Sequence, residues 1–458
     1  MSGIDTGSEE LFHRDRRSQW VFWSFWATIV LIAAAFYFDK AADNRSAFVR
    51  WRPQVLQFAQ GVNIYDKMLF PTPPLMPITL YPLMVLPTVT GAMSWFALKV
   101  VMTSAALVMC FRFVRPREGV LPPMFRSLVL LLSLRPILGD LHHGNNNLLI
   151  LFLIVSTLAA WRKGYDVTAG LLLALATTYK VTPALFFVYF AYKRSWRTVS
   201  WGLLGMGIFL LILPSAIIGP SFNGECLGMW WTRMVMPFVS EGAASPQEVN
   251  QSVIGVLFRL LTRPLHGVGP YSVEMDVHMA ELAPSAVKWL IKGVVAVLLG
   301  LLAALCRTRT TDRRDPRLLG EFSLVVLTML FVSERSWKHH YVTILLPMTY
   351  LAAEFFSARI TRRGRTVIAG SWVLSFLLMA STSPELGGLF FDGQGHEMAQ
   401  AYGLFMWAGL VMYAAVAWRV WARRNEPTPS DSDGPMTPVY RPHATTVRAG
   451  VNLATKTT

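Results

Sequence analysis

The strongest constraint on the fold is a series of long apolar segments that recur from Trp20 to Trp421, with short polar turns between them. A helix needs about 20 mainly apolar residues to cross a bilayer, where every backbone polar group must be satisfied within the structure. The composition agrees, because 53% of the 458 residues are hydrophobic and only 15% are charged. These properties exclude a soluble globule and predict an all-α, polytopic helical membrane protein.

Basic residues indicate the orientation of the predicted helices. Loops on one side all carry Lys or Arg, at 112–117, 161–165, 193–197, 307–317, 359–365 and from Arg419 onward; the opposite loops are mixed in charge, at 39–74, 141–147, 220–284, 333–341 and 382–400. Because cytoplasmic loops are enriched in Lys and Arg, we predict about 12 transmembrane helices in the cell (inner) membrane, with both termini cytoplasmic. The net charge of +15 is distributed over these loops, so nucleic acid is not expected as a partner.

The chain is expected to divide into three parts. We predict a cytoplasmic N-terminal segment at 1–19, a multi-spanning domain at 20–424, and a disordered cytoplasmic tail at 425–458, which is rich in Pro, Thr and Ser. The first apolar segment lacks a small-residue cleavage site and is expected to remain as a helix. The segment 70–87 is apolar but short and interrupted by prolines, which is typical of a helix lying in the membrane interface.

The first outer loop carries a carboxylate and several guanidinium groups. Asp43 stands a few residues beyond the first apolar segment and is followed by Arg45, Arg50 and Arg52. A carboxylate near the membrane surface can act as a general base, and Arg side chains bind phosphate oxygens well. The alternative interpretation is that Asp43 is simply solvated, as most isolated aspartates are.

A polar turn at 142–147 separates two apolar segments and contains two imidazoles and three side-chain amides. Such groups are costly in lipid unless they are paired, and they are well suited to binding sugar hydroxyls. The alternative is that Asn145 or Asn146 caps the helix that follows.

Lys180 interrupts the apolar stretch 167–192 and is followed by Pro183, which breaks the helix near the outer surface. An intramembrane lysine is a candidate functional residue, and its charge could bind a phosphate. The alternative is that its ammonium group extends to the membrane interface.

Two pairs of adjacent histidines, His142-His143 and His339-His340, lie in two different outer loops. Their spacing matches no zinc motif and few acidic residues lie nearby, so hydrogen bonding or phosphate contact is favoured over a metal site. Glu334, Arg335 and Lys338 beside the second pair favour an anionic ligand. No metal and no cofactor is predicted.

The order of these motifs resembles glycosyltransferase family 87. The resemblance extends over about Trp20 to Trp421, and it is carried by the outer-loop acid, Gly-x-x-x-Tyr at 61–65 with its Pro-Pro-Leu segment, Gly-Asn-Asn-Asn at 144–147, Tyr-Lys-x-x-Pro at 179–183, Asn-Gln-Ser at 250–252 and Ser-Trp-x-His-His at 336–340. It implies the C-type glycosyltransferase fold, a helical bundle whose outer loops and interfacial helices carry the active site. It also implies a polyprenyl-phosphate sugar donor, often a mannose donor, a glycan or lipid-linked acceptor, and transfer with inversion.

The resemblance assigns the catalytic carboxylate to Asp43, with Asp39 as the substitute because the family's acid usually falls nearer the Gly-x-x-x-Tyr element. The expected substrate-binding residues are Arg50, Arg52, Tyr65, His142, His143, Asn145, Asn147, Lys180, Asn250, Ser252, Arg335, Trp337, Lys338, His339 and His340. Asn145 stands where the family usually has Gln, which keeps the amide chemistry and shortens the reach. A transporter or lipid flippase remains the alternative, since it would also contain broken helices and an intramembrane lysine. A scaffold without catalytic activity is a third possibility.

Overall fold

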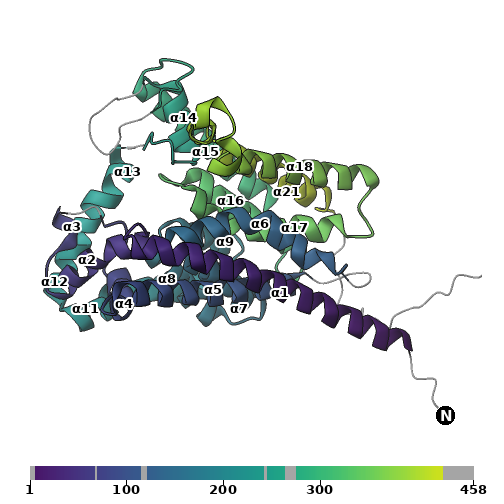
Figure 1. Ribbon diagram of the computed structural model, residues 1–458, viewed down its shortest axis with the longest axis horizontal. Helices are drawn as coiled ribbons and strands as arrows, with labels where there is room; N and C mark the ends of the chain where they lie inside the picture. Colours follow the sequence, from purple (N-terminus) through teal and green to yellow (C-terminus); the bar gives the residue numbers. More distant parts are fainter. Residues whose placement is uncertain (1–5, 68–69, 115–120, 242–244, 264–274, 426–458) are drawn as a thin grey trace, which may run out of the picture. The chain divides into compact units, whose positions relative to one another are not determined.

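The computed structural model describes residues 6–67, 70–114, 121–241, 245–263 and 275–425, and these residues form helices joined by loops (Figure 1). We find no strand in these ranges. In chain order the elements are α1 (Thr6–Ala42), α2 (Ala47–Ala59), α3 (Ile64–Lys67), α4 (Leu75–Met84), α5 (Thr88–Phe113), α6 (Met124–His143), α7 (Asn147–Arg162), α8 (Asp166–Tyr179), η1 (Thr182–Ala184), α9 (Leu185–Tyr192), α10 (Trp196–Gly207), η2 (Ile208–Ile212), α11 (Leu213–Ile218), α12 (Pro220–Trp230), η3 (Trp231–Val235), α13 (Met236–Glu241), α14 (Val253–Leu261), α15 (Pro284–Leu305), α16 (Arg317–Val332), η4 (Lys338–Ile344), α17 (Leu345–Phe355), α18 (Arg362–Ala380), α19 (Pro384–Gly387), η5 (Phe391–Gly393), α20 (Gly395–Ala401) and α21 (Leu404–Ala422).

Five of the described helices are long and apolar enough to cross a membrane. They comprise Arg17–Ala42 of α1, α5, the continuous helix Trp196–Ile218, α15 and α21. Shorter apolar helices accompany them, namely α4, α7, α8 and the segment Thr182–Tyr192. The prediction of an all-α, multi-pass membrane protein is therefore confirmed, whereas the number of about 12 spans stays a prediction.

Two other predicted features can be compared with the helices. The described part of the segment 1–19 is helical, because α1 begins at Thr6. The segment predicted as an interfacial helix contains α4, which has only 10 residues and includes Pro82. Beyond Asn425, the predicted disordered tail lies outside the described residues.

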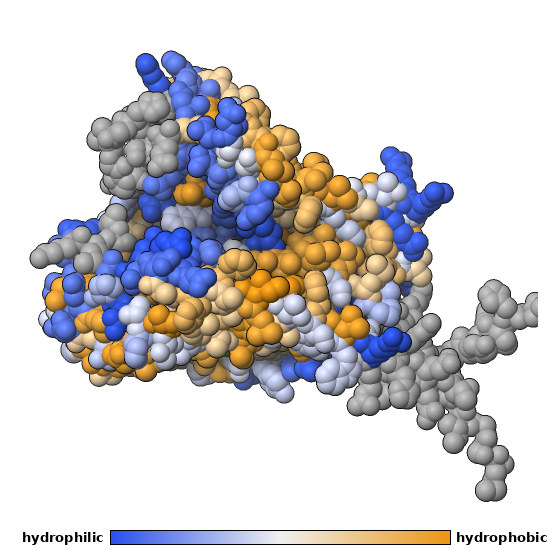
Figure 2. All heavy atoms as spheres, viewed as in Figure 1, coloured by the Kyte–Doolittle hydropathy of each residue, from blue (hydrophilic) through white to orange (hydrophobic). Residues whose placement is uncertain are grey.

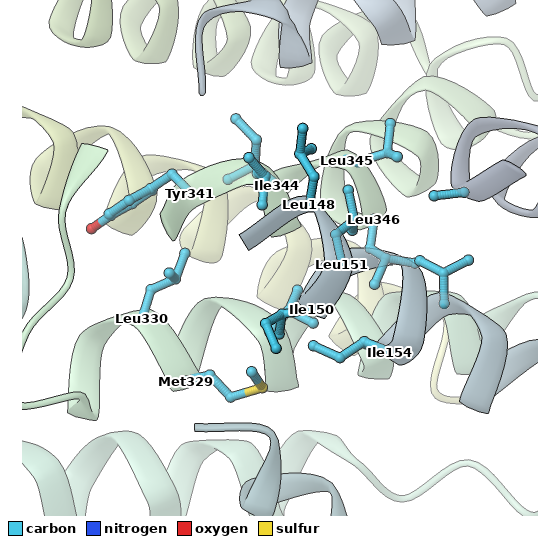
Figure 3. Close-up of a cluster of buried hydrophobic side chains, with 14 of the residues drawn as sticks. Leu148, Ile150, Leu151, Ile154, Met329, Leu330, Tyr341, Ile344, Leu345 and Leu346 are labelled. Atoms are coloured by element: carbon cyan, nitrogen blue, oxygen red, sulfur yellow. The ribbon is translucent and has the colours of Figure 1, made fainter. Parts of the chain in front are cut away.

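A buried apolar cluster joins the middle of the chain to its C-terminal half. Figure 3 shows side chains of α7, α16, η4 and α17 in contact, among them Leu148, Ile150, Leu151, Ile154, Met329, Leu330, Tyr341, Ile344, Leu345 and Leu346. Helix α16 is buried along almost its whole length. In lipid, no hydrophobic effect drives helices together, because lipid tails are as apolar as the side chains. Helices there associate through close packing of this kind. The packing holds the loop before η4 beside the start of α7.

The turn between α6 and α7 depends on Gly144. Its φ of 78° lies in the left-handed region, and a Cβ atom here would lie 2.8 Å from the hydroxyl oxygen of Tyr37. Glycine is the residue that accepts both conditions. Asn146 occupies the N-cap position of α7 without a capping side-chain hydrogen bond. The Asp140 carboxylate instead accepts a hydrogen bond of 3.2 Å from the backbone N–H of Asn147.

Candidate active site in an amphipathic cavity

A cavity of about 710 Å³ is lined by residues of α2, α8, α9 and α16, by the turn between α6 and α7, and by the segment between α16 and η4. Its polar lining includes Arg50, His143, Asn145, Asn146, Lys180, Glu334, Arg335, Trp337 and His340, and its apolar lining includes Phe70, Met76, Leu185, Val188, Trp230, Met234, Val235, Phe238 and Met329. In Figure 2, hydrophilic side chains gather around a hollow in the face shown, near the C-terminal end of α1. A cavity that is lined by both apolar and cationic side chains can accept an amphipathic anion.

Four rings form a cluster beside the cavity, namely those of His143, Trp337, His339 and His340. The His143 and His339 rings stack at 4.5 Å between centroids, and the Trp337 and His340 rings lie nearly parallel at 6.2 Å. Asn145 Nδ2 lies 3.1 Å from His339 Nε2. The two loops that contain the histidine pairs therefore lie side by side. Within the described ranges, we find no group of three or more His, Cys, Asp or Glu side chains placed to hold a metal ion.

Lys180 ends α8 and is held by a chain of buried polar groups. Its ammonium donates a hydrogen bond of 2.6 Å to Asn147 Oδ1, and Asn147 Nδ2 donates one of 2.9 Å to Asp140 Oδ2. Lys99 Nζ lies 3.2 Å from Asp140 Oδ1, and both of these side chains are fully buried. When all three groups are ionised, two lysines and one aspartate leave one positive charge. Because Lys180 lines the cavity, this charge is available to a bound anion.

Lys99 and Asp140 were missed by the sequence reasoning. Each is a charged residue within an apolar helix, Lys99 inside α5 and Asp140 near the end of α6. Isolated intramembrane charges are a functional signal that could have identified them. Only the structure shows that they pair with each other and reach Lys180 through Asn147.

The side chains of Asn250 and Ser252 form hydrogen bonds with backbone groups near the cavity. Asn250 Nδ2 donates a hydrogen bond of 2.8 Å to the carbonyl oxygen of Glu334, and its Oδ1 accepts one of 3.0 Å from the N–H of Ser336. Ser252 is the N-cap of α14, and its hydroxyl accepts a hydrogen bond of 3.0 Å from the N–H of Gly255. Asn250 and Ser252 are both fully buried. They support the segment that contains Glu334 and do not line the cavity.

Glu334 lines the cavity and forms an ion pair with Arg335, in which Arg335 Nε lies 3.2 Å from Glu334 Oε1. Burial raises the pKa of Glu334, and the neighbouring Arg335 partly opposes this increase. The sequence reasoning named Glu334 only as part of a charged neighbourhood and did not include it among the site residues.

The predicted catalytic carboxylates lie elsewhere. Asp43 is exposed and forms an ion pair of 2.7 Å with Arg45, and Asp39 is exposed on α1. Neither residue lines the cavity. Asp43 therefore has the solvated surroundings of the alternative interpretation.

Six further predicted binding residues lie outside the lining, and two of them, Asn147 and His339, contact lining residues as described above. Arg52 donates hydrogen bonds to the carbonyl oxygens of Met84 and Leu86, which ties α2 to the end of α4. The buried hydroxyl of Tyr65 donates one of 2.8 Å to the carbonyl oxygen of Thr72. The remaining two are His142, which is exposed, and Lys338, whose Nζ donates a hydrogen bond of 3.3 Å to the carbonyl oxygen of Thr382.

The apolar helices define a multi-pass membrane protein, and its cavity is lined by both apolar and cationic side chains. The model of glycosyltransferase family 87 matches residues 70–333, more than half of the chain, and the chain belongs to this family.

Two curated relatives support the family assignment. The first is 27% identical over 219 residues and is the polyprenol-phosphate-mannose-dependent alpha-(1-2)-phosphatidylinositol mannoside mannosyltransferase of Mycolicibacterium smegmatis; the match covers 46% of this chain and 42% of the relative. The second is 26% identical over 323 residues and is the polyprenol-phosphate-mannose-dependent alpha-(1-2)-phosphatidylinositol pentamannoside mannosyltransferase of Mycobacterium tuberculosis. This match covers 67% of this chain and 65% of the relative. The chain thus spans less than two thirds of the length of either relative. No solved structure matches.

Proposed function

We propose that the protein is an integral-membrane glycosyltransferase that transfers mannose from a polyprenyl-phosphate donor to a glycan or lipid-linked acceptor, with inversion. The observation that carries this proposal is a cavity lined by both apolar and cationic side chains. The names of the two relatives support the donor and a glycolipid acceptor. The basic loops support a site on the non-cytoplasmic face of the inner membrane, with both termini cytoplasmic.

The donor's chemistry fits both kinds of lining residue. Leu185 and Val188 of α9 and Phe238 of α13 offer apolar contacts for a polyprenyl chain. The donor phosphate would lose its water on entering the cavity, which is costly unless cations replace that water. Lys180 and Arg50 line the cavity and would supply the compensating charge. Their charge would also stabilise the polyprenyl phosphate that leaves the sugar.

The ring cluster and the α6–α7 turn offer groups suited to a sugar. Trp337 lines the cavity beside His143 and His340, and Asn145 supplies an amide from the facing turn. Amides and imidazoles pair with hydroxyl groups, and aromatic rings cover the apolar faces of sugars. We assign this part of the cavity to the transferred mannose and the acceptor.

A reconstituted transfer assay tests the proposal. Purified protein in liposomes is incubated with radiolabelled polyprenyl-phosphate mannose and a phosphatidylinositol mannoside, and the lipid products are separated. We expect label in a larger glycolipid, with the new bond inverted relative to the donor, and none when a nucleotide-linked mannose replaces the donor. Movement of the donor between leaflets without transfer would instead favour a flippase.

A further inference from the structure

We infer that Glu334 is a catalytic residue whose carboxylate accepts the proton of the acceptor hydroxyl, held in place by a clamp formed by residues 250–252. This inference rests on the proposed function and assigns the proton transfer to a residue that the sequence motifs did not select. Asp43 and Asp39 are the competing assignments.

The composition of the cavity wall is the first observation. Among the described residues that line the cavity, Glu334 is the one with a carboxylate side chain. Its side chain is 23% exposed, so it is sheltered yet accessible from the cavity. A general base must come within hydrogen-bond reach of the proton that it removes. Asp43, with a side chain that is 59% exposed, does not reach the lining.

The clamp is the second observation. The Asn250 amide bonds to the backbone on both sides of Arg335, at the Glu334 carbonyl and the Ser336 N–H. The backbone N–H of Gln251 donates a further hydrogen bond of 2.6 Å to the carbonyl oxygen of Ser336. The fully buried Asn250 side chain therefore fixes the irregular segment that connects α16 to η4. Such rigidity keeps a catalytic group in its productive position.

Gly255 makes room for this clamp. A Cβ atom added at Gly255 would lie 2.1 Å from Asn250 Nδ2, closer than any ordinary contact. The absence of a side chain at this first turn of α14 thus allows the Asn250 amide to reach Glu334 and Ser336. Asn250 is a positioning residue in this arrangement, since it acts through the backbone of Glu334.

The charges around the cavity suit the two ends of the reaction. Lys180 and Arg50 provide positive charge for the departing phosphate, whereas Glu334 provides the negative group for the proton. Burial raises the pKa of Glu334, which strengthens it as a base, and Arg335 favours its charged form. A purely structural ion pair would not require a carboxylate and cations that face the same cavity.

The transfer step needs only the donor, the acceptor hydroxyl, Glu334 and water. The acceptor oxygen forms a bond to the anomeric carbon from the face opposite the donor phosphate. The bond from that carbon to the phosphate oxygen breaks, and its electron pair leaves with the polyprenyl phosphate. The hydroxyl proton moves to Glu334 and then to water.

The test uses the full-length protein in liposomes with polyprenyl-phosphate mannose and a phosphatidylinositol mannoside. We expect Glu334→Gln to lower kcat by roughly a hundredfold or more while donor binding persists. The matched control is Glu397→Gln, which changes an exposed carboxylate outside the lining and should leave kcat unchanged. In the unmodified protein, kcat/KM should fall as the pH decreases through the raised pKa of Glu334, because protonation removes the base. This acid limb should be absent in Glu334→Gln.

The outcomes separate the inference from the proposed function. Absence of transfer by the unmodified protein refutes the proposed function and the inference with it. Normal turnover by Glu334→Gln, or inactivity of Asp43→Asn or Asp39→Asn with an active Glu334→Gln, refutes the inference alone. A slow Glu334→Gln that retains the acid limb shows that Glu334 only pairs with Arg335, and this result also overturns the inference. Melting of the purified variants checks that each one is folded.

Discussion

Lys180→Ala removes the positive charge that the buried polar chain presents to the cavity. In the unmodified protein, Asp140 balances Lys99, and Lys180 is left to meet the donor phosphate. A hydrogen bond to a charged group contributes about 1.5–3 kcal/mol. At 1.4 kcal/mol for each factor of ten, the donor Kd should increase about 10-fold to 150-fold. Turnover should also decrease, because the leaving phosphate carries more charge in the transition state.

The assay compares donor Kd and kcat for three variants in liposomes. Lys180→Arg keeps the charge with a larger and less flexible head group, so we expect it to retain part of the activity. Lys163→Ala is the control, since Lys163 is an exposed lysine that follows α7 and lies outside the cavity. If Lys180 merely extends to the membrane interface, Lys180→Ala and Lys180→Arg will both be mild. Near-normal donor binding and turnover in Lys180→Ala would refute the role assigned to its charge.

Three further predictions concern the supporting structure. Lys99→Met should destabilise the protein by about 3–5 kcal/mol, because the buried Asp140 loses its partner; adding Asp140→Asn should recover part of the lost thermal stability, and no recovery would contradict the pairing. Gly255→Ala should displace the amide clamp and lower kcat more than the donor affinity, and equal kcat values would argue against the clamp. A cysteine introduced at Val62 should react with an impermeant thiol reagent from outside the cell and one at Lys163 should not, with the reverse pattern inverting the proposed topology.

Much of the fold class was available from the sequence because it depends on local properties. The length of an apolar segment and the Lys and Arg residues beside it can be seen in that segment alone. Within lipid, such a segment has few alternatives to a helix. The five long apolar helices and the absence of strands in the described ranges agree with that reading. Lys180 was also identified locally, since a charge within an apolar stretch next to Pro183 is conspicuous in the sequence.

Pairings between distant residues were decided by the tertiary structure. His143 belongs to the polar turn at 142–147 and His339 to the Ser-Trp-x-His-His motif, but their ring stacking depends on how α6, α7 and η4 pack together. The sequence gives no sign that Asp140 neutralises Lys99, because each residue belongs to a different apolar helix. These contacts join groups that are far apart along the chain, and helix periodicity does not specify which helices become neighbours.

The placement of the carboxylates shows the same limit. Asp43 and Glu334 are both acids in outer loops, and motif order favoured Asp43. The clamp from Asn250 joins residues 84 positions apart and brings the Glu334 segment to the cavity wall, whereas Asp43 pairs with its neighbour Arg45 in solvent. The sequence determined that this protein is a helical membrane protein, because bilayer solvation acts on each segment separately. Which polar groups share the cavity was decided only by the tertiary packing, because that outcome depends on all the segments together.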